Sequence, residues 1–134
     1  MSQKIPCIML IDDNPDDNFF HERVIRKNNL ADHIVIRQSG PEALEYLTKN
    51  HEHQEPHPDL IFLDINMPGM NGWEFLEAYG ELEKEKQGKL IVVILTTSEN
   101  PEDYQQAMDK VTASDFRNKP LTKTMLVELI EKYF

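Results

Sequence analysis

Carboxylates stand where two apolar runs of the sequence end. The run Ile5–Ile11 is followed directly by Asp12 and Asp13, and the run Leu60–Leu63 is followed by Asp64. Like charges repel each other when they gather in one place, so such a cluster favours the binding of a compensating cation. Carboxylates are hard oxygen ligands, which indicates Mg²⁺, with Mn²⁺ as the alternative.

Hydroxyl and ammonium groups stand at the ends of two further runs. The apolar run Leu90–Leu95 is followed by the hydroxyl segment Thr96–Ser98, and a short strand predicted at Asp115–Arg117 comes just before Lys119. In an open α/β sheet, ligands bind in the crevice beyond the carboxyl ends of the strands. We therefore expect these groups to meet the carboxylates at one rim, where a cation and a phosphoryl oxygen would both find ligands.

The elements that must position these groups alternate between two kinds of pattern. The apolar runs, with a further one at Ile34–Ile36, are continuous and rich in Ile, Leu and Val, which is typical of strands covered on both faces. Amphipathic patterns between them predict helices, the first with Phe20, Val24 and Ile25 on its apolar side. The predicted helices are Asp16–Lys27, Pro41–Lys49, Trp73–Lys84, Pro101–Lys110 and Thr122–Phe134. This alternation predicts an α/β fold, with a parallel sheet between two layers of helices.

The segment Asn50–Asp59 has no periodicity and contains two prolines, which predicts a long exposed loop. Its histidines, His51, His53 and His57, could suggest a transition-metal site. Such a site needs a defined geometry and supporting hydrogen bonds that this polar segment does not indicate. A solvated loop is therefore the preferred interpretation.

Composition limits the classes of function. The 134 residues fit one compact domain, and 40% of them are hydrophobic. With 14 Lys and Arg against 24 Asp and Glu, the net charge is −10, which disfavours direct binding to nucleic acid or to an anionic membrane. Cys7, the single cysteine, cannot form a disulfide within the chain. The N-terminal residues match neither a signal peptide nor a membrane span, so we expect a cytoplasmic protein.

Taken together, the motifs resemble the receiver domain of two-component response regulators. They are Asp12-Asp13, Asp64 in D-I-N-M-P-G-M-N-G, Leu95-Thr96-Thr97 and Lys119-Pro120, in the order and approximate spacing of that family. The resemblance covers nearly the whole chain. It implies a CheY-like, flavodoxin-like fold, a doubly wound five-stranded parallel sheet in the order 2-1-3-4-5. It also implies one receiver domain over residues 1–134, without an effector domain.

The resemblance assigns the acidic residues to phosphoryl transfer. Asp64 would accept a phosphoryl group from a phosphohistidine, carried by a sensor histidine kinase or a histidine phosphotransfer protein. Asp13 and Asp64 would bind Mg²⁺ directly, together with the backbone carbonyl of Asn66, and Asp12 would act mainly through a bound water. The domain would catalyse its own phosphorylation and dephosphorylation, and would not act as an enzyme on another substrate.

The resemblance also implies a conformational switch. Lys119 would pair with Asp64 at rest and with the phosphoryl oxygens afterwards, and the peptide bond between Lys119 and Pro120 would be cis. Thr96 would hydrogen-bond the phosphoryl group while the ring of Phe116 swings inward. The distance from Thr96 to Lys119 is one residue longer than is usual in the family, so Thr97 remains an alternative switch residue.

The partners implied are a phosphodonor protein and an unidentified downstream protein target. The segment Asn50–Asp59 resembles the extended loop of stand-alone regulators that pair with bacterial phytochromes. The apolar residues of Thr122–Phe134, including Tyr133 and Phe134, suggest a homodimer through the fourth helix, fifth strand and last helix. The alternative is that these side chains pack inward.

Three other functions share parts of this pattern. The first is a binding module that has lost phosphotransfer, which the intact acids and Lys119 disfavour. The second is a metal-dependent phosphatase with an aspartyl nucleophile, which usually has a second acid where this chain has Asn66. The third is a flavin-binding protein of the same fold, which would need a hydroxyl- and glycine-rich loop where this chain has Asp12 and Asp13.

Overall fold

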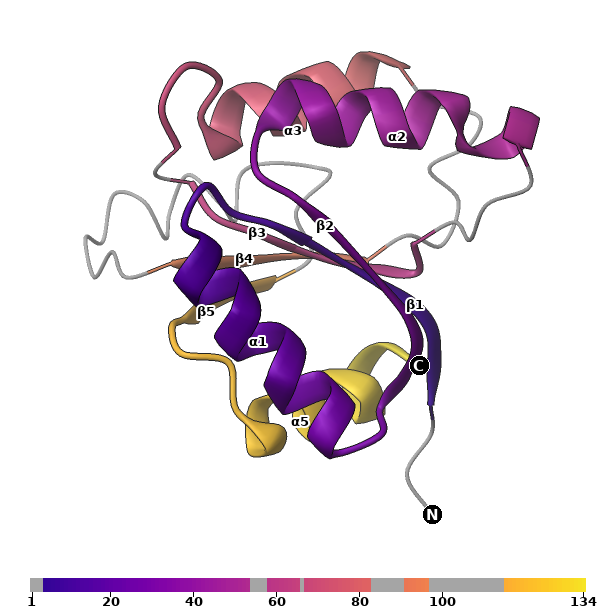
Figure 1. Cartoon of the computed structure of the whole chain (residues 1–134), viewed down its shortest axis with the longest axis vertical. Coiled ribbons are helices and arrows are strands. Elements are labelled where there is room, and N and C mark those ends of the chain that lie inside the picture. The colour runs from indigo at the N-terminus through magenta and orange to yellow at the C-terminus, as the bar shows by residue number, and fades with distance from the viewer. Residues whose placement is uncertain (1–3, 54–57, 66, 83–90, 97–114) are drawn as a thin grey trace.

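The computed structural model describes five strands that form one parallel sheet, in the order β2-β1-β3-β4-β5 (Figure 1). The predicted fold class and strand order are therefore confirmed. The strands are β1 Ile5–Ile11, β2 Ala31–Arg37, β3 Leu60–Leu63, β4 Ile91–Thr96 and β5 Asp115–Asn118. The helices are α1 Pro15–Lys27, α2 Gly40–His53, α3 Gly72–Leu82 and α5 Lys123–Tyr133. The residues described are 4–53, 58–65, 67–82, 91–96 and 115–134.

Helices cover both faces of the sheet, with α2 and α3 on one face and α1 and α5 on the other (Figure 1). Each layer encloses its own hydrophobic core. The first contains Tyr46 of α2 and Phe75 of α3, and the second contains Ile25 of α1 and Leu129 of α5. The central strands are therefore buried on both sides, which is why their sequences are continuously apolar.

Successive residues of the central strands point into opposite cores, as the pleat of a strand requires. In β3, Ile61 and Leu63 belong to the core under α2 and α3. Leu60 and Phe62 belong to the core under α1 and α5. A shift in register by one residue would exchange the side chains that face the two cores. Packing on both faces therefore fixes the register of the strand, and with it the position of the residues that follow the strand end.

Two elements extend by three or more residues beyond one of their predicted ends. Strand β2 begins at Ala31, three residues before the predicted Ile34, because its pairing with β1 starts there. The exposed polar residues Asp32 and His33 interrupt the apolar pattern, so the sequence did not reveal this start. Helix α2 continues to His53, so the predicted loop from Asn50 is wrong in its first four residues. In both elements the regular backbone continues past the apolar spacing from which it was predicted, and this explains both errors.

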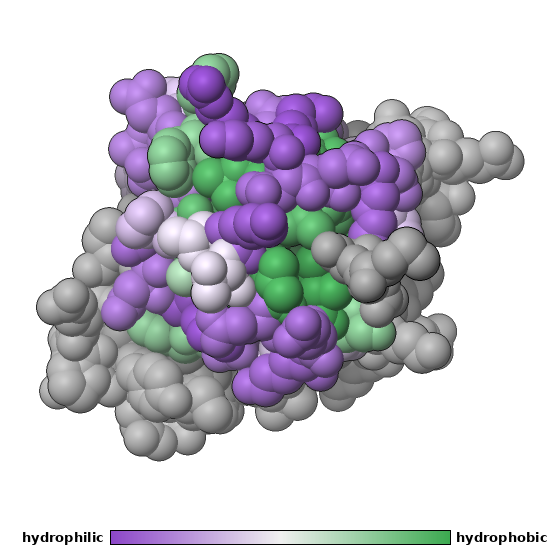
Figure 2. Space-filling view, turned by 90° about the horizontal axis from the view of Figure 1, so that it is seen from below, coloured by the Kyte–Doolittle hydropathy of each residue, from purple (hydrophilic) through white to green (hydrophobic). Residues whose placement is uncertain are grey.

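The apolar side of α1 also differs from the prediction. Its buried residues are Asn18, His21 and Ile25. Phe20, which was expected to face the core, is 48% exposed, and Phe19 is 64% exposed. Figure 2 views the side of the molecule that carries α1 and α5, and shows apolar side chains at the surface bordered by hydrophilic ones. The buried polar residues of α1, Asn18 and His21, line a cavity at the candidate site.

Cys7 lies inside β1, buried and without a disulfide partner. Burial raises the pKa of its thiol from 9.0 to about 11, with a smaller contribution from the charge of Asp59. Its backbone N–H donates to Asp59 Oδ2 at 3.2 Å. Among the described residues, no helix combines the length and the apolar character that a membrane crossing requires.

Candidate functional site

Three carboxylates converge at the carboxyl ends of β1 and β3. One oxygen from each of Asp12, Asp13 and Asp64 lies within 4.8 Å of the others. The two strands are adjacent in the sheet, and the N–H of Asp64 donates to Ile11 O at 2.9 Å, which extends the pairing to the first residue of the site. The sheet therefore brings together the acids that the sequence singled out.

The side chain and backbone of Asp12 are held by several hydrogen bonds. The N–H of Asn14 donates to its Oδ1 at 3.0 Å, and the side-chain amide of Asn18 donates to its carbonyl at 2.8 Å. Its own N–H donates to Arg37 O at 3.1 Å. Asp12 is only 4% exposed, so these bonds compensate for the cost of burying its polar groups.

Lys119 reaches the same carboxylates from the segment after β5. Its ammonium lies 2.6 Å from Asp12 Oδ2, 2.8 Å from Asp17 Oδ2 and 3.8 Å from Asp64 Oδ2. The predicted pair with Asp64 is thus the longest of three contacts, and too long for a hydrogen bond. The nearer partners are Asp12 and Asp17, of which Asp17 was not predicted as a site residue.

The charge of Lys119 is favoured by these neighbours. Burial alone lowers the pKa of a lysine, but the hydrogen bonds to Asp12 and Asp17 and the charge of Asp64 outweigh burial and raise the pKa of Lys119. The lysine therefore supplies a permanent positive charge opposite the acids.

The first turn of α1 places Asp17 beside Lys119. Asn14 caps the helix, and its Oδ1 accepts hydrogen bonds from the N–H groups of Asp16 at 2.9 Å and Asp17 at 3.3 Å. Pro15 follows at the first helical position, where its missing N–H costs nothing. The two acids of this turn also interact favourably with the helix dipole.

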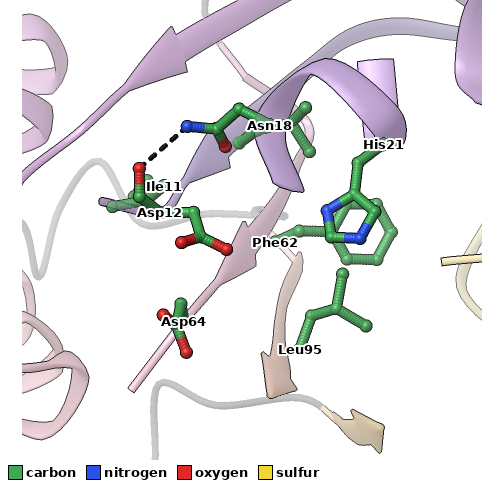
Figure 3. A pocket seen from close by; sticks show the side chains of 8 residues that line it. Ile11, Asp12, Asn18, His21, Phe62, Asp64 and Leu95 are labelled. Carbon is green, nitrogen blue, oxygen red and sulfur yellow. Dashed lines mark hydrogen bonds between the residues drawn. The ribbon is translucent and has the colours of Figure 1, made fainter. Parts of the chain in front are cut away.

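A small cavity lies behind the acids, between α1 and the sheet (Figure 3). It encloses about 10 Å³, roughly the space that one water molecule needs. The Oδ1 atom of Asn18 is buried without a hydrogen-bond partner among the described residues. The lining residues are Leu10, Ile11, Asp12, Asn18, His21, Phe62, Asp64 and Leu95.

His21 is the titratable group of α1 at this cavity, and it is only 3% exposed. Burial is the main cause that lowers its pKa, and the positive charge of Lys119 lowers it further. The charges of Asp17 and Asp12 act in the opposite direction but do not outweigh these effects. His21 is therefore neutral near pH 7, beside an acidic site.

The chain after β3 turns sharply into α3. Asn71 and Glu74 form a capping box, in which Asn71 N–H donates to Glu74 Oε1 at 3.0 Å and Glu74 N–H donates to Asn71 Oδ1 at 2.9 Å. Gly72 packs so closely on the preceding segment that a Cβ atom there would lie 2.7 Å from Ile65 Cα and 3.0 Å from Asp64 O. Glycine at this position thus lets α3 begin close to the backbone of Asp64, the candidate acceptor.

The remaining predicted site residues are described in part. Thr96 is the last residue of β4, and its backbone is paired with Asn118 of β5. Phe116 is half-buried in β5 against the core under α2 and α3. The peptide bond between Lys119 and Pro120 is cis, as predicted. The other predictions, for Asn66, Thr97, Ser98, His57 and the helix Pro101–Lys110, lie outside the described residues.

The donor set fits a small hard cation. Mg²⁺ binds oxygen at about 2.1 Å, so oxygens on opposite sides of the ion are about 4.2 Å apart. One oxygen from each of Asp12, Asp13 and Asp64 lies within 4.8 Å of the others, close to this limit. Asp13 is less buried than the other two, so that water can complete the coordination, as Mg²⁺ prefers.

Comparison with known proteins decides the family. The family model described as "Response regulator receiver domain" matches residues 8–131. The chain belongs to the response regulator receiver family. It is therefore a receiver domain of two-component systems, which favours phosphoryl signalling over the phosphatase and flavin-binding alternatives.

Relatives of this receiver domain include free-standing regulators and parts of larger kinases. Response regulator Rcp1 of Synechocystis is 33% identical over 98 residues, which are 72% of this chain and 65% of Rcp1. The sensor histidine kinase GacS of Pseudomonas protegens is 24% identical over 133 residues, which are 99% of this chain and 14% of GacS. The chain thus spans less than two thirds of the length of these curated relatives.

Solved structures of response regulators agree with the assignment of the chain to this family. A two-component response regulator from Cytophaga hutchinsonii is 32% identical, with 98% of both chains covered and a TM-score of 0.89. The Mn²⁺-bound form of Rcp1 is 26% identical, with 95% of this chain and 90% of that chain covered and a TM-score of 0.71. The phosphorylated cyanobacterial phytochrome regulator RcpA is also 26% identical, with 96% and 90% covered and a TM-score of 0.74. The predicted similarity to phytochrome-associated regulators is confirmed.

Three residues of this receiver site were missed by sequence reasoning, namely Asp17, Asn18 and His21. The spacing of Asn18, His21 and Ile25 is itself that of a buried helical face, but two of the three residues are polar and were therefore not read as buried. Asp17 was visible as the second of two acids in the first turn of α1, without any sign that it contacts a lysine 102 residues away.

Proposed function

We propose that this receiver domain accepts a phosphoryl group on Asp64 from a phosphohistidine and signals through the resulting change in conformation. The observation that carries the proposal is the position of Asp64 between two further carboxylates, Asp12 and Asp13, and the ammonium of Lys119. The donor would be a sensor histidine kinase or a histidine phosphotransfer protein. Kinase relatives such as GacS and the phosphorylated structure of RcpA support this assignment.

The reaction assigns a separate task to each residue of the site. A carboxylate oxygen of Asp64 attacks the phosphorus, the P–N bond to the donor imidazole breaks, and its electron pair leaves with the imidazole. Lys119 then moves from its resting partners to the phosphoryl oxygens, whose charge it compensates. Because a carboxylate is a weak nucleophile, most of the rate must come from orientation and charge stabilisation. The same site would later orient water for dephosphorylation.

A divalent cation fits this proposal. Asp13, Asp64 and the backbone carbonyl of Asn66 would hold Mg²⁺, or Mn²⁺ as the alternative, which would offset the negative charge of both the acids and the incoming group. Both carboxylate oxygens of Asp12 already accept hydrogen bonds, from Asn14 and Lys119. This supports the prediction that Asp12 acts through a bound water. The Mn²⁺-bound structure of Rcp1 is consistent with such a site.

The proposed switch links the site to the far edge of the sheet. Thr96, or Thr97 in its place, would hydrogen-bond the phosphoryl group, and the ring of Phe116 would move inward with it. Phe116 lies in β5, opposite Ile94 of β4, so a movement at the end of β4 has a short path to it. The output would be a changed surface for a downstream protein.

The proposal extends to the assembly of the protein. It places a single receiver domain in the cytoplasm, without direct binding to nucleic acid or membrane, and as a homodimer through the region of α5. Tyr133 and Phe134 are half-buried against the core under α1 and α5, which leaves part of each side chain available to a partner. Light scattering with and without beryllofluoride tests the dimer, and a monomer under both conditions would overturn it.

The phosphoacceptor proposal is tested by incubating the chain with acetyl phosphate and Mg²⁺ and measuring its intact mass. We expect one phosphoryl adduct, which is lost in Asp64→Asn and on removal of Mg²⁺ by EDTA. The matched control is Asp32→Asn, which removes an exposed aspartate paired with Lys4 and should leave the adduct intact. No adduct on the wild-type chain in the presence of Mg²⁺ would favour the alternative of a binding module without phosphotransfer.

A further inference from the structure

We propose that Asp17 is a positioning residue, which holds Lys119 away from Asp64 at rest and thereby restrains phosphorylation. The inference rests on the proposed function and adds a regulatory contact to it. Asp17 touches neither the expected acceptor nor the expected cation ligands in any contact described above, and would act through Lys119 alone.

The distances support a competition for one ammonium group. Lys119 Nζ donates to Asp12 at 2.6 Å and to Asp17 at 2.8 Å, whereas Asp64 Oδ2 is 3.8 Å away. An ammonium has three N–H donors with tetrahedral directions, and two of them are directed at Asp12 and Asp17. The resting geometry thus favours these two carboxylates over the acceptor.

Burial makes the competition effective. The side chain of Lys119 is 10% exposed, and those of Asp12 and Asp64 are 6% and 8% exposed. Water therefore screens these contacts poorly. The side chain of Asp17 is 37% exposed, so its contact with the lysine is more accessible to water than the contacts with Asp12 and Asp64.

Because Asp17 belongs to α1, its contact with Lys119 joins two separate elements of the fold. Asp12 belongs to the rim itself, but Asp17 belongs to a helix that begins three residues after it, at Pro15. Asn14 fixes that first turn by accepting from the N–H of Asp17. The contact with Lys119 therefore connects α1 to the segment between β5 and α5, and the lysine must loosen this connection to reach a phosphoryl group on Asp64.

Two effects of Asp17 act in the same direction. It competes for Lys119, and its negative charge repels an incoming phosphoryl group. Replacement by asparagine removes both effects, so a second variant is needed to separate them. Asp16→Asn removes the same charge from the same turn, and Asp16 makes no contact with Lys119 among the interactions of the described residues. Asp17→Glu keeps the charge and the ability to reach the lysine.

The experiment compares the wild-type chain with Asp17→Asn, Asp16→Asn and Asp17→Glu. Beryllofluoride is titrated at fixed Mg²⁺ and followed by the fluorescence of Trp73, the single tryptophan, and the rate of phosphorylation by acetyl phosphate is followed by intact mass. For Asp17→Asn we expect about fivefold tighter binding and faster phosphorylation, the size expected for one charge-assisted hydrogen bond in a partly exposed position. Asp16→Asn should change either quantity by less than about twofold, and Asp17→Glu should behave as the wild type does.

The ¹⁵Nζ resonance of Lys119 gives a readout that a general loss of stability would not produce. It should shift in Asp17→Asn and not in Asp16→Asn. Equal behaviour of Asp17→Asn and Asp16→Asn in both assays would overturn the role of Asp17, while the wild-type adduct still supports the proposed function. Absence of any adduct or beryllofluoride binding in the wild type would instead overturn the proposed function, and the role of Asp17 with it.

Discussion

The hydrogen bonds of Asp12 show how a single residue of the site is held in a fixed orientation. Its N–H donates to Arg37, its carbonyl accepts from Asn18, and its two carboxylate oxygens accept from Asn14 and Lys119. A buried carboxylate with these partners is fixed in orientation before any ligand arrives. Such preorganisation lowers the cost of ordering the site at the moment of reaction.

At the same scale, His21 predicts a pH dependence of stability. Burial and the charge of Lys119 lower its pKa below the ordinary value of 6.5, so the unfolded chain takes up a proton first as the pH falls. Its contribution to stability is therefore complete above about pH 6.5 and is lost as the pH drops toward the lowered pKa. The loss is at most about 1.4 kcal/mol per pH unit.

The measurement is urea unfolding of the wild type and of His21→Gln between pH 7.5 and 5.5. The wild type should lose more stability than the variant over this range, because the variant lacks the titrating group. His33→Gln serves as a control, since His33 is exposed in β2, and it should retain the wild-type slope. Parallel slopes for the wild type and His21→Gln would contradict the prediction.

At the scale of elements, the junction between β3 and α3 carries a prediction. A methyl group at Gly72 would lie 2.7 Å from Ile65 Cα and 3.0 Å from Asp64 O, so backbone must move to admit it. We expect Gly72→Ala to destabilise the fold by about 1–3 kcal/mol, despite the better helix propensity of alanine. NMR should show shifted amide resonances at Asp64 and Ile65.

Gly69→Ala provides the contrast for this prediction. Gly69 has a φ of +75°, and no atom lies within 4 Å of the position that a Cβ would take, so the cost there is backbone strain of about 1–2 kcal/mol without a clash. The amide resonances of Asp64 and Ile65 should then stay close to their wild-type positions. Unchanged stability and spectra in Gly72→Ala would show that the close packing at α3 is not required.

The elements also show how far the sequence could predict this structure. Strands buried on both faces have continuous apolar sequences, so β1, β3 and β4 were predicted to within one residue at each end. The edge strand β2 and the end of α2 were not, because backbone pairing and helical bonding continue there without apolar spacing. The convergence of the acids followed from parallel topology, whereas the contact between Lys119 and Asp17 depends on side-chain positions that no local pattern contains.

At the scale of the whole molecule, the acidic site predicts that Mg²⁺ stabilises the fold. An ion that binds only the folded chain adds about 2.7 kcal/mol at one hundred times its dissociation constant. Asp13→Asn removes a proposed ligand and also reduces the repulsion among the acids. This variant should therefore be slightly more stable than the wild type in EDTA, and less stable than it in saturating Mg²⁺.

Thermal unfolding with and without Mg²⁺ tests this reversal. Asp32→Asn is again the control, because its carboxylate pairs with Lys4 and should not affect the response to the metal. The net charge of −10 attracts any cation, so the measurement should include moderate salt. Equal stabilisation of the wild type and Asp13→Asn by Mg²⁺ would show that Asp13 is not a ligand.

The burial of Cys7 has a practical consequence for studying the switch. Only thiolates react readily with maleimides, and a thiol with a pKa of about 11 is almost fully protonated near neutral pH. A cysteine introduced at a surface position can therefore carry a fluorophore or spin label on the natural background. Distances between α5 and the rim could then be followed in solution during phosphorylation, without replacing the native thiol.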